Sequence, residues 1–335
     1  MVSKVKKGAA YQYRPLLINM ANKQKGFTLV EMLISLSVGV VLLGGIMSAF
    51  VGMRTTSAET SSIGELQENG RFALNIITDD LLRQDFWGDY TGTFDLANLS
   101  ASPNADVLSN DCEGEGLNNT SFPRATGHFR TLWGETAASS SIIDCIDDAK
   151  VGSDVLQLKR VISSAVTTST ANNYYLVTNM NTGVLFTGTN IPEVDNSQVW
   201  EYQHHVYYVK EETVNGEIFP VLMQGRLTTD MTFDPIIDGI EMIRFMYGVD
   251  TTGDGIINAY LSAENVSEDQ WDNADDINIL AVRIFVLTRA IRQDFKYSNT
   301  NTYVLGDLEV PMDDNYRRLL LSSTVTLYNA GVDSW

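Results

Sequence analysis

The sequence is poor in the residues that most often carry catalysis or bind metals. Its 335 residues include two cysteines and three histidines, and no Cys-x-x-Cys pair. The HExxH, GxSxG, P-loop and GxGxxG motifs are also missing, which argues against the enzyme classes that these motifs mark. The 42 acidic residues are too many for any pair to stand out as a catalytic dyad. We therefore expect no enzymatic activity, and an enzyme is the least favoured class of function.

The three histidines do not suggest a metal site. His204 and His205 are adjacent in a predicted strand, so their side chains should point to opposite faces of the sheet. His128 is remote in the sequence. An ordinary surface or core histidine pair is therefore the favoured interpretation.

Basic residues are scarce and unevenly distributed. There are 23 Lys and Arg against 42 acids, a net charge of −19, and six of the 23 lie in residues 1–26, which contain no acid. The rest of the chain has 17 basic and 42 acidic residues, a net charge of −25. This acidic part contains no run of Lys or Arg, so we expect no nucleic-acid partner.

Residues 32–53 contain no Asp, Glu, Lys or Arg. A helix of that length spans roughly 33 Å, enough to cross a bilayer. The positive charges precede this run, which predicts that the N-terminus stays in the cytoplasm and that the C-terminus lies on the outer side of the membrane. Glu31 stands at the start of the apolar segment, where a carboxylate costs about a few kcal/mol, so a functional role with a charged partner is favoured.

Small residues recur along the apolar run. They are Ser35, Gly39, Gly44, Ser48 and Gly52. Such a stripe fits close packing of helices in lipid, and it also fits the ordinary glycine content of a membrane helix.

Glu31 belongs to a longer pattern, K-G-F-T-L-V-E-M-L-I-S-L, at residues 25–36. This pattern resembles the class III signal of type IV pilins and type II secretion pseudopilins. The resemblance implies cleavage by a prepilin peptidase after Gly26, N-methylation of Phe27, and pairing of the Glu31 carboxylate with the N-terminal amine of a neighbouring subunit. A secretory signal peptide is disfavoured because its cleavage site follows the apolar core. Family leaders are shorter than 26 residues, and a start at Met20 would give one of ordinary length.

Cys112 and Cys145 would meet an oxidising compartment in an exported chain, where an even pair favours a disulfide. Closing this 34-residue loop would remove roughly 3–4 kcal/mol of unfolded-chain entropy. Two free buried thiols are the alternative. The pair lies in residues 89–150, which are rich in Gly, Asn, Ser and Asp, so we expect an irregular insertion held by the disulfide.

Helical spacing continues beyond the membrane segment. Apolar residues recur near every 3.6 positions at Ile63, Leu66, Ala73, Ile77 and Leu81. We expect one long helix whose first half is residues 27–53. Its amphipathic second half lies in residues 54–88 and stays helical up to residue 86. Poor helix formers in 55–62, together with Gly64 and Gly70, leave a bend or break open as an alternative.

Residues 151–335 carry strand patterns. The predicted strands are 154–161, 184–186, 199–210, 217–224, 240–247, 279–289 and 317–328, with Asn215-Gly216 as a hairpin turn. In 279–289 both alternating sets of side chains are largely apolar, which places that strand centrally in its sheet. The predicted fold class is α+β: a long N-terminal helix packed on a large antiparallel β-rich head of one domain or two lobes.

Several later segments resemble the PilW-type minor pilins. They are L-Q-E-N-G-R-F-A-L at 66–74, D-D-L-L-R at 79–83, Trp87-Gly88, G-V-D-T-T-G-D-G at 248–255 with Asn258 and Tyr260, V-R-I at 282–284 and Y-R-R at 316–318. The resemblance is weak over 89–150 and 161–235. It implies a pilin-like, non-enzymatic subunit that primes assembly of a type IV pilus and sits at its tip, with roles in piliation, twitching motility and adhesion.

The same resemblance implies the partners and the location. The partners are other minor pilins, the major pilin, a tip adhesin, the prepilin peptidase and the inner-membrane assembly platform. The chain would reside in the inner membrane before it enters the extracellular fibre. Two alternatives stay open: a J-type minor pseudopilin of type II secretion, and an adhesive ligand-binding module that uses 89–150 for recognition.

One loop places oxygen-bearing side chains at alternate positions. These are Asp250, Thr252, Asp254 and then Asn258, with Gly255 for the sharp turn. The order resembles a calcium loop of the D-x-D-x-D-G type. Leu261 stands where an EF-hand needs a bidentate Glu, so a true EF-hand is disfavoured. Calcium and a plain polar turn between two strands are the two interpretations, and no other cofactor is expected.

Overall fold

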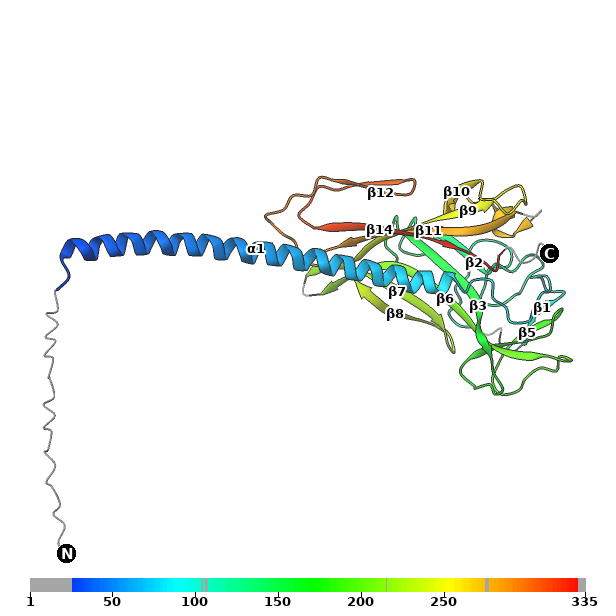
Figure 1. Ribbon diagram of the computed structural model, residues 1–335. Helices are drawn as coiled ribbons and strands as arrows, with labels where there is room; N and C mark the ends of the chain where they lie inside the picture. The colour runs from blue at the N-terminus through cyan, green and yellow to red at the C-terminus, as the bar shows by residue number, and fades with distance from the viewer. Residues whose placement is uncertain (1–25, 104, 106–107, 215, 275–276, 331–335) are drawn as a thin grey trace, which may run out of the picture. The chain divides into compact units, whose positions relative to one another are not determined.

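The computed structural model describes residues 26–103, 105, 108–214, 216–274 and 277–330. Its contacts divide the chain into two units, Met1–Ala58 and Glu59–Trp335. The second unit, called the head below, contains all of the β-structure (Figure 1).

A single α-helix, α1 (Leu29–Leu81), contains the apolar segment and continues into the head. Neither the poor helix formers of 55–62 nor the two glycines interrupt it. The helix ends at Leu81, earlier than the predicted residue 86, and turns follow. Asp85 has a φ of 60°, a left-handed conformation that a right-handed helix does not accommodate.

The predicted apolar stripe of α1 faces the head with one exception. Leu66, Ala73, Ile77 and Leu81 are buried. Ile63 is 49 % exposed, so its assignment to the buried stripe was wrong. The buried face therefore begins one turn later than predicted.

The larger sheet of the head has eight strands: β1 (Leu99–Ala101), β2 (Leu132–Thr136), β3 (Asp154–Ala165), β4 (Tyr174–Thr178), β5 (Gly183–Thr187), β6 (Gln198–Val214), β7 (Glu217–Leu227) and β8 (Met231–Asp238). Its order is β1-β5-β4-β6-β3-β2, and β7 pairs with both β6 and β8. Successive parts of β6 pair with β4, β3 and β7, so this long strand holds the sheet together.

The smaller sheet has the order β10 (Ala259–Ser262), β9 (Ile240–Asp250), β11 (Asn278–Arg289) and β14 (Arg318–Thr326). A separate hairpin pairs β12 (Thr302–Leu305) with β13 (Leu308–Pro311). Two short helices, η1 (Ala263–Asn265) and α2 (Glu268–Trp271), follow β10. Because β11 lies between β9 and β14, its predicted central position is confirmed.

Each of the seven predicted strands coincides with an observed one. The sequence patterns missed β1, β2, β4, β8, β10, β12 and β13. Both β1 and β2 lie within residues 89–150, so the predicted irregular insertion contributes two short strands to the larger sheet. These strands are only three and five residues long, too short for an alternating pattern to stand out.

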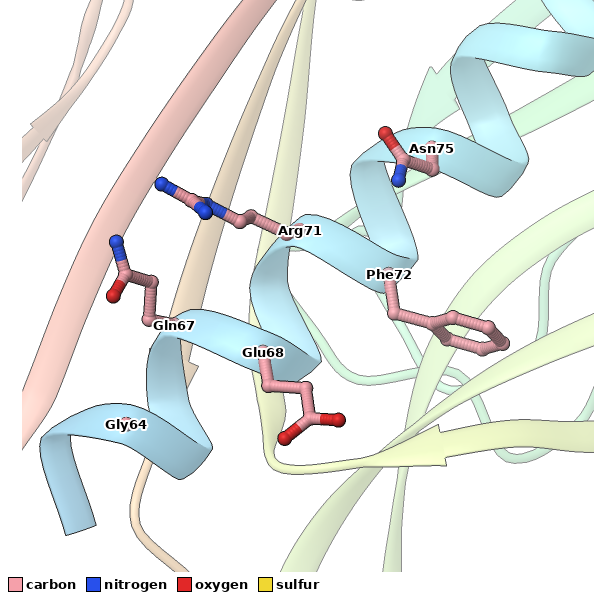
Figure 2. A pocket seen from close by; sticks show the side chains of 6 residues that line it. All are labelled: Gly64, Gln67, Glu68, Arg71, Phe72 and Asn75. Carbon is pink, nitrogen blue, oxygen red and sulfur yellow. The ribbon is translucent and has the colours of Figure 1, made fainter. Parts of the chain in front are cut away.

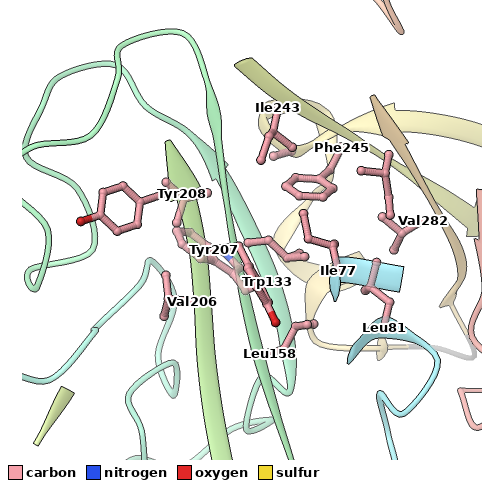
Figure 3. Close-up of a cluster of buried hydrophobic side chains, with 14 of the residues drawn as sticks. Ile77, Leu81, Trp133, Leu158, Val206, Tyr207, Tyr208, Ile243, Phe245 and Val282 are labelled. Atoms are coloured by element: carbon pink, nitrogen blue, oxygen red, sulfur yellow. The ribbon is translucent and has the colours of Figure 1, made fainter. Parts of the chain in front are cut away.

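One hydrophobic cluster joins α1 to both sheets. Figure 3 shows Ile77 and Leu81 of α1 among Trp133, Leu158 and Tyr207 of the larger sheet and Ile243, Phe245 and Val282 of the smaller one. A second cluster around Trp87, Phe129 and Tyr202 lies under the loops of 86–129. The first cluster thus packs α1 against both sheets, and the α+β fold class is confirmed.

Candidate functional site

The predicted processing region lies at the start of α1. Gly26, Phe27 and Thr28 precede the helix, and Phe27 is 83 % exposed. The Thr28 N–H and hydroxyl both donate to Glu31 Oε2 at 2.9 Å, and the Glu31 N–H donates to Thr28 Oγ1 at 3.2 Å. This reciprocal pairing is a capping box, and it holds the carboxylate at the positive end of the helix dipole. The predicted leader, apart from Gly26, lies outside the described residues.

Thr28 is a residue that the sequence patterns did not single out. A role was predicted for the charge of Glu31 alone, although Thr-x-x-Glu before an apolar run is the sequence signature of a capping box. Glu31 thus has a local structural role as well as the predicted role in assembly, which stays a prediction.

The first half of α1 is apolar and uncovered by the rest of its own unit. Its large apolar side chains between Leu29 and Met53 are 52–77 % exposed. By length and composition, the helix can cross a membrane. A Cβ atom added to Gly39, Gly44 or Gly52 would meet nothing within 4 Å, so these glycines leave room for another helix to approach.

In the head, the PilW-like segment 66–74 separates into two faces of α1. Leu66, Gly70, Ala73 and Leu74 are buried. Gly70 permits the closest approach, since an added Cβ would lie 2.5 Å from Leu321 Cδ1 and 2.9 Å from Thr288 Cγ2. Glycine at this position therefore sets the distance between α1 and the smaller sheet.

The opposite face of α1 carries an open groove of about 380 Å³. It is lined by Gly64, Gln67, Glu68, Arg71, Phe72 and Asn75 (Figure 2). Figure 2 shows Gln67 and Arg71 on one side of the helix and Glu68 and Phe72 on the other. Phe72 is 46 % exposed, so an aromatic side chain and two opposite charges are available to a neighbouring protein surface.

A buried ionic network fastens the end of α1 to the larger sheet. Asp80 Oδ1 accepts from Arg160 Nε at 2.7 Å and Nη2 at 2.6 Å, while Oδ2 lies 2.6 Å from His205 Nδ1 and accepts from the Tyr207 hydroxyl at 2.9 Å. Burial by itself would raise the pKa of Asp80, but His205 and Arg160 outweigh it and hold the pKa well below its usual range. Asp80 is therefore ionised at neutral pH.

The sequence held a signal for this network. Asp80 follows Ala73 and Ile77 at helical spacing, so a carboxylate occupies a position of the buried stripe. Such a position calls for a buried cationic partner, but the stripe alone does not say which one.

The histidines point to different surroundings, as predicted. His205 meets Asp80, whereas His204 is fully buried with its Nδ1 2.7 Å from Ser121 Oγ. Ser121 Oγ also donates to Asp111 Oδ1 at 2.6 Å. The serine thus lies between the acid and the histidine, unlike a catalytic triad, in which histidine is central. Since Ser121 is fully buried, the cluster presents no accessible nucleophile.

The predicted disulfide between Cys112 and Cys145 is present, with an S–S distance of 2.01 Å. It rules out the alternative of two free thiols. Cys112 is fully buried in the main hydrophobic cluster, so the bridge ties the 89–150 segment to the core.

The predicted calcium loop joins β9 to β10. Asp250 Oδ1 accepts from the Thr252 and Gly253 N–H groups at 2.9 and 3.0 Å, and Oδ2 accepts from the Gly255 N–H at 2.6 Å. These bonds, led by that of Thr252, lower the pKa of Asp250. Asn258 Oδ1 accepts from the Thr251 N–H, and Asp254 Oδ1 from the Ile256 N–H.

Over the described ranges, no group of three or more His, Cys, Asp or Glu side chains is placed to hold a metal ion. The hydrogen bonds show that the loop oxygens organise the turn, and calcium binding at Asp250, Thr252, Asp254 and Asn258 stays a prediction.

Two family models match the chain. Residues 206–329, from within β6 to just beyond the end of β14, match the model described as Type IV Pilus-assembly protein W. Residues 21–47 match the prokaryotic N-terminal methylation motif, which covers Gly26, Phe27 and Glu31. No curated protein and no solved structure matches the chain.

Proposed function

We propose that this chain is a PilW-type minor pilin, which its matches over residues 206–329 and 21–47 support, and that it helps to prime assembly of a type IV pilus and sits at or near the pilus tip. In this role it supports piliation, twitching motility and adhesion. The matches point to a structural pilus protein rather than an enzyme, and the methylation motif with its apolar helix fits membrane anchoring before incorporation into the fibre.

The observation that carries the proposal is the exposure of α1 over both of its halves. The apolar half is uncovered, and in the head the outward face forms the groove around Phe72. A helix with uncovered apolar surface needs lipid or other protein to cover it. Lipid covers the first half before assembly, and neighbouring minor and major pilins cover both halves afterwards.

The order of events follows from the N-terminus. The prepilin peptidase cleaves after Gly26, and the new amine of Phe27 is methylated. The carboxylate of Glu31 then pairs with the N-terminal amine of a neighbouring subunit, because two opposite charges in lipid offset each other's desolvation. The C-terminal head is periplasmic at this stage, beside the inner-membrane assembly platform, and later lies beneath a tip adhesin.

The capping box gives the test its design. Glu31→Gln keeps a side chain that can cap the helix but removes the charge, whereas Glu31→Ala removes both. We expect both variants to insert in the membrane and to be cleaved, and both to lower the number of pili per cell. Imaging of cells that carry each variant at its native locus measures this.

The comparison of the two variants decides the mechanism. If Glu31→Gln restores normal piliation while Glu31→Ala does not, the residue acts as a cap and the charge-pairing role is wrong. Normal pilus number, length and motility after deletion of the whole gene would overturn the priming function. Loss of protein secretion with intact pili would assign the chain to the pseudopilins instead.

A second candidate function, adhesive binding by the 89–150 segment, rests on a groove of about 410 Å³ in that segment. It is lined by residues 93–97 and 126–128, and the rings of Phe94 and His128 lie 5.8 Å apart. Loss of surface attachment in Phe94→Ala cells with normal pilus number would favour this function. Unchanged attachment would remove it.

A further inference from the structure

The loop at residues 290–297, between β11 and the β12–β13 hairpin, presents an unusually exposed aromatic side chain. Phe295 is 83 % exposed, the highest value among the large apolar residues described in the head. Its neighbours Arg292 and Lys296 are exposed as well. An isolated exposed apolar residue is common on protein surfaces, so exposure alone does not indicate a binding site. The position of Phe295 and its charged neighbours are the further evidence.

This loop is fixed against the beginning of the head's part of α1. Arg317 Nη2 lies 2.9 Å from Asp294 Oδ2 and 3.2 Å from Glu59 Oε1. The ring of Tyr297 packs 4.4 Å from the Arg317 guanidinium. In Figure 1 the segment that leads to β12 accordingly lies beside α1. The loop is therefore held in place through Glu59, the first residue of the head.

Glu59 is close to the membrane segment along the chain. The uncharged run ends at Met53, six residues earlier. Six residues span about 20 Å at most when extended and about 9 Å when helical. The Phe295 loop is thus held beside Glu59, a residue that follows the apolar run by only six positions in the sequence.

A second apolar tip lies at the same end of the head. Val214 and Ile218, at the ends of β6 and β7, are 49 % and 50 % exposed. Arg289, the last residue of β11, donates from Nη2 to the Ile218 carbonyl at 2.8 Å, which brings this tip to the start of the 290–297 loop. Glu217 at this tip is acidic, so this tip does not attract anions. Of the two, only the 290–297 loop offers basic side chains to an anionic surface.

The loop also differs from the rest of the head in charge. Arg292 and Lys296 are exposed, whereas Asp294 and Glu59 both pair with Arg317. Residues 290–297 contain two bases and one acid, in a chain that has 17 bases to 42 acids beyond its leader. Basic side chains flanking an exposed aromatic ring are the combination that binds the surface of an anionic membrane.

We propose that the 290–297 loop docks on the headgroup layer of the membrane that holds α1, with Phe295 at the boundary of the acyl chains. Arg292 and Lys296 contact lipid phosphates, and Val214 and Ile218 rest on the same surface. This contact fixes the orientation of the head on the bilayer before the subunit is extracted into a fibre. The proposal depends on the membrane anchoring of this chain and is independent of its role at the tip.

The experiment uses the full chain in vesicles of phosphatidylethanolamine and phosphatidylglycerol. Both native cysteines are in a disulfide, so Phe295→Cys introduces one reactive thiol for an environment-sensitive fluorophore. Leu117→Cys is the matched control, because Leu117 is 80 % exposed and lies in the 89–150 segment, where Thr131 donates to Asp85, a residue beyond the C-terminal end of α1.

We expect the emission maximum of the label at position 295 to shift to the blue in vesicles. We also expect lipid with a nitroxide on its headgroup to quench this emission. The label at position 117 should show neither effect. Reversing both charges, with Arg292→Glu and Lys296→Glu, should restore emission in these vesicles. The double variant Arg83→Glu and Arg226→Glu, which changes two exposed arginines elsewhere on the head, should not.

Equal access of aqueous iodide to the labels at positions 295 and 117 overturns the proposal. If the label at 295 is open to iodide in vesicles but protected in isolated pili, the loop contacts a neighbouring subunit and membrane docking is wrong. No other pilus component is present in the vesicles, so the result does not depend on whether the chain primes pilus assembly.

Discussion

The ionic network at Asp80 offers the most direct test of how α1 is attached to the head. Asp80→Asn keeps the shape of the side chain and removes its charge. The Asp80 and Arg160 side chains are only 5 % and 4 % exposed, so the guanidinium would stay buried without a counter-ion. The new amide would also place a donor toward the Tyr207 hydroxyl, which now donates to Asp80 Oδ2 at 2.9 Å.

The expected loss can be worked out from these contacts. Removing one partner of a buried ion pair costs about 3–5 kcal/mol, because the other charge is left uncompensated. The matched control is Asp79→Asn, one residue earlier on the same helix. Asp79 pairs with Arg83 at 2.6 Å, but both side chains are more than half exposed, so we expect a loss of about 0.5 kcal/mol or less.

The effect of Asp80→Asn should depend on pH with a definite sign. The folded-state pKa of Asp80 is lowered, so its stabilising contribution is present above the unfolded pKa and is lost as pH falls through the folded pKa. The free-energy difference between wild type and Asp80→Asn should therefore be constant near neutral pH. It should shrink as pH falls below about 4, the ordinary pKa of aspartate.

Denaturant unfolding of the full chain in detergent, followed by tryptophan fluorescence, measures both quantities. The two variants and the wild type are compared at neutral pH and at intervals down to pH 3. A loss below about 1 kcal/mol for Asp80→Asn, or a loss equal to that of Asp79→Asn, would refute the reasoning that the network carries a buried charge. A difference that grows in acid would show that the sign is wrong.

Three further predictions concern packing, the disulfide and calcium. Gly70→Val should lower the free energy of unfolding by about 1–3 kcal/mol, because the new side chain would clash with Leu321 and Thr288. The control Gly64→Val, with open space around the glycine, should change the free energy of unfolding by less than about 0.5 kcal/mol. Equal effects of the two substitutions in denaturant titrations would contradict the packing argument. Cys112→Ser with Cys145→Ser should cost about 3–4 kcal/mol; an unchanged denaturation midpoint relative to the oxidised wild type would count against a bridge that constrains the chain. If the β9–β10 loop binds calcium, calorimetric titration of the full chain with calcium should give heat, and Asp250→Asn should abolish it. Extracellular sites bind calcium as weakly as about millimolar, so no heat and no shift in melting temperature at that concentration would reject the site.

Local patterns in the sequence predicted the parts of the protein that depend on neighbouring residues. The uncharged run of 32–53 and the helical spacing up to Leu81 predicted one long helix, which the structure contains. Alternation of apolar residues predicted the long strands, including the central β11. The short strands β1 and β2 carry too few residues for a pattern, and pairing with β5 and β3 makes them strands.

The sequence by itself determined the long apolar helix, the methylation motif and the α+β character of this protein, because periodicity and short motifs are recorded in adjacent residues. The tertiary structure alone decided which distant residues meet. Asp80 finds Arg160 and His205 across 80 and 125 positions, and Glu59 finds Arg317 across 258. The stripe position of Asp80 required some partner, but many cations could satisfy that requirement. Only the packing of α1 against two sheets selects among them, and the same packing brings the Phe295 loop beside the first residue of the head.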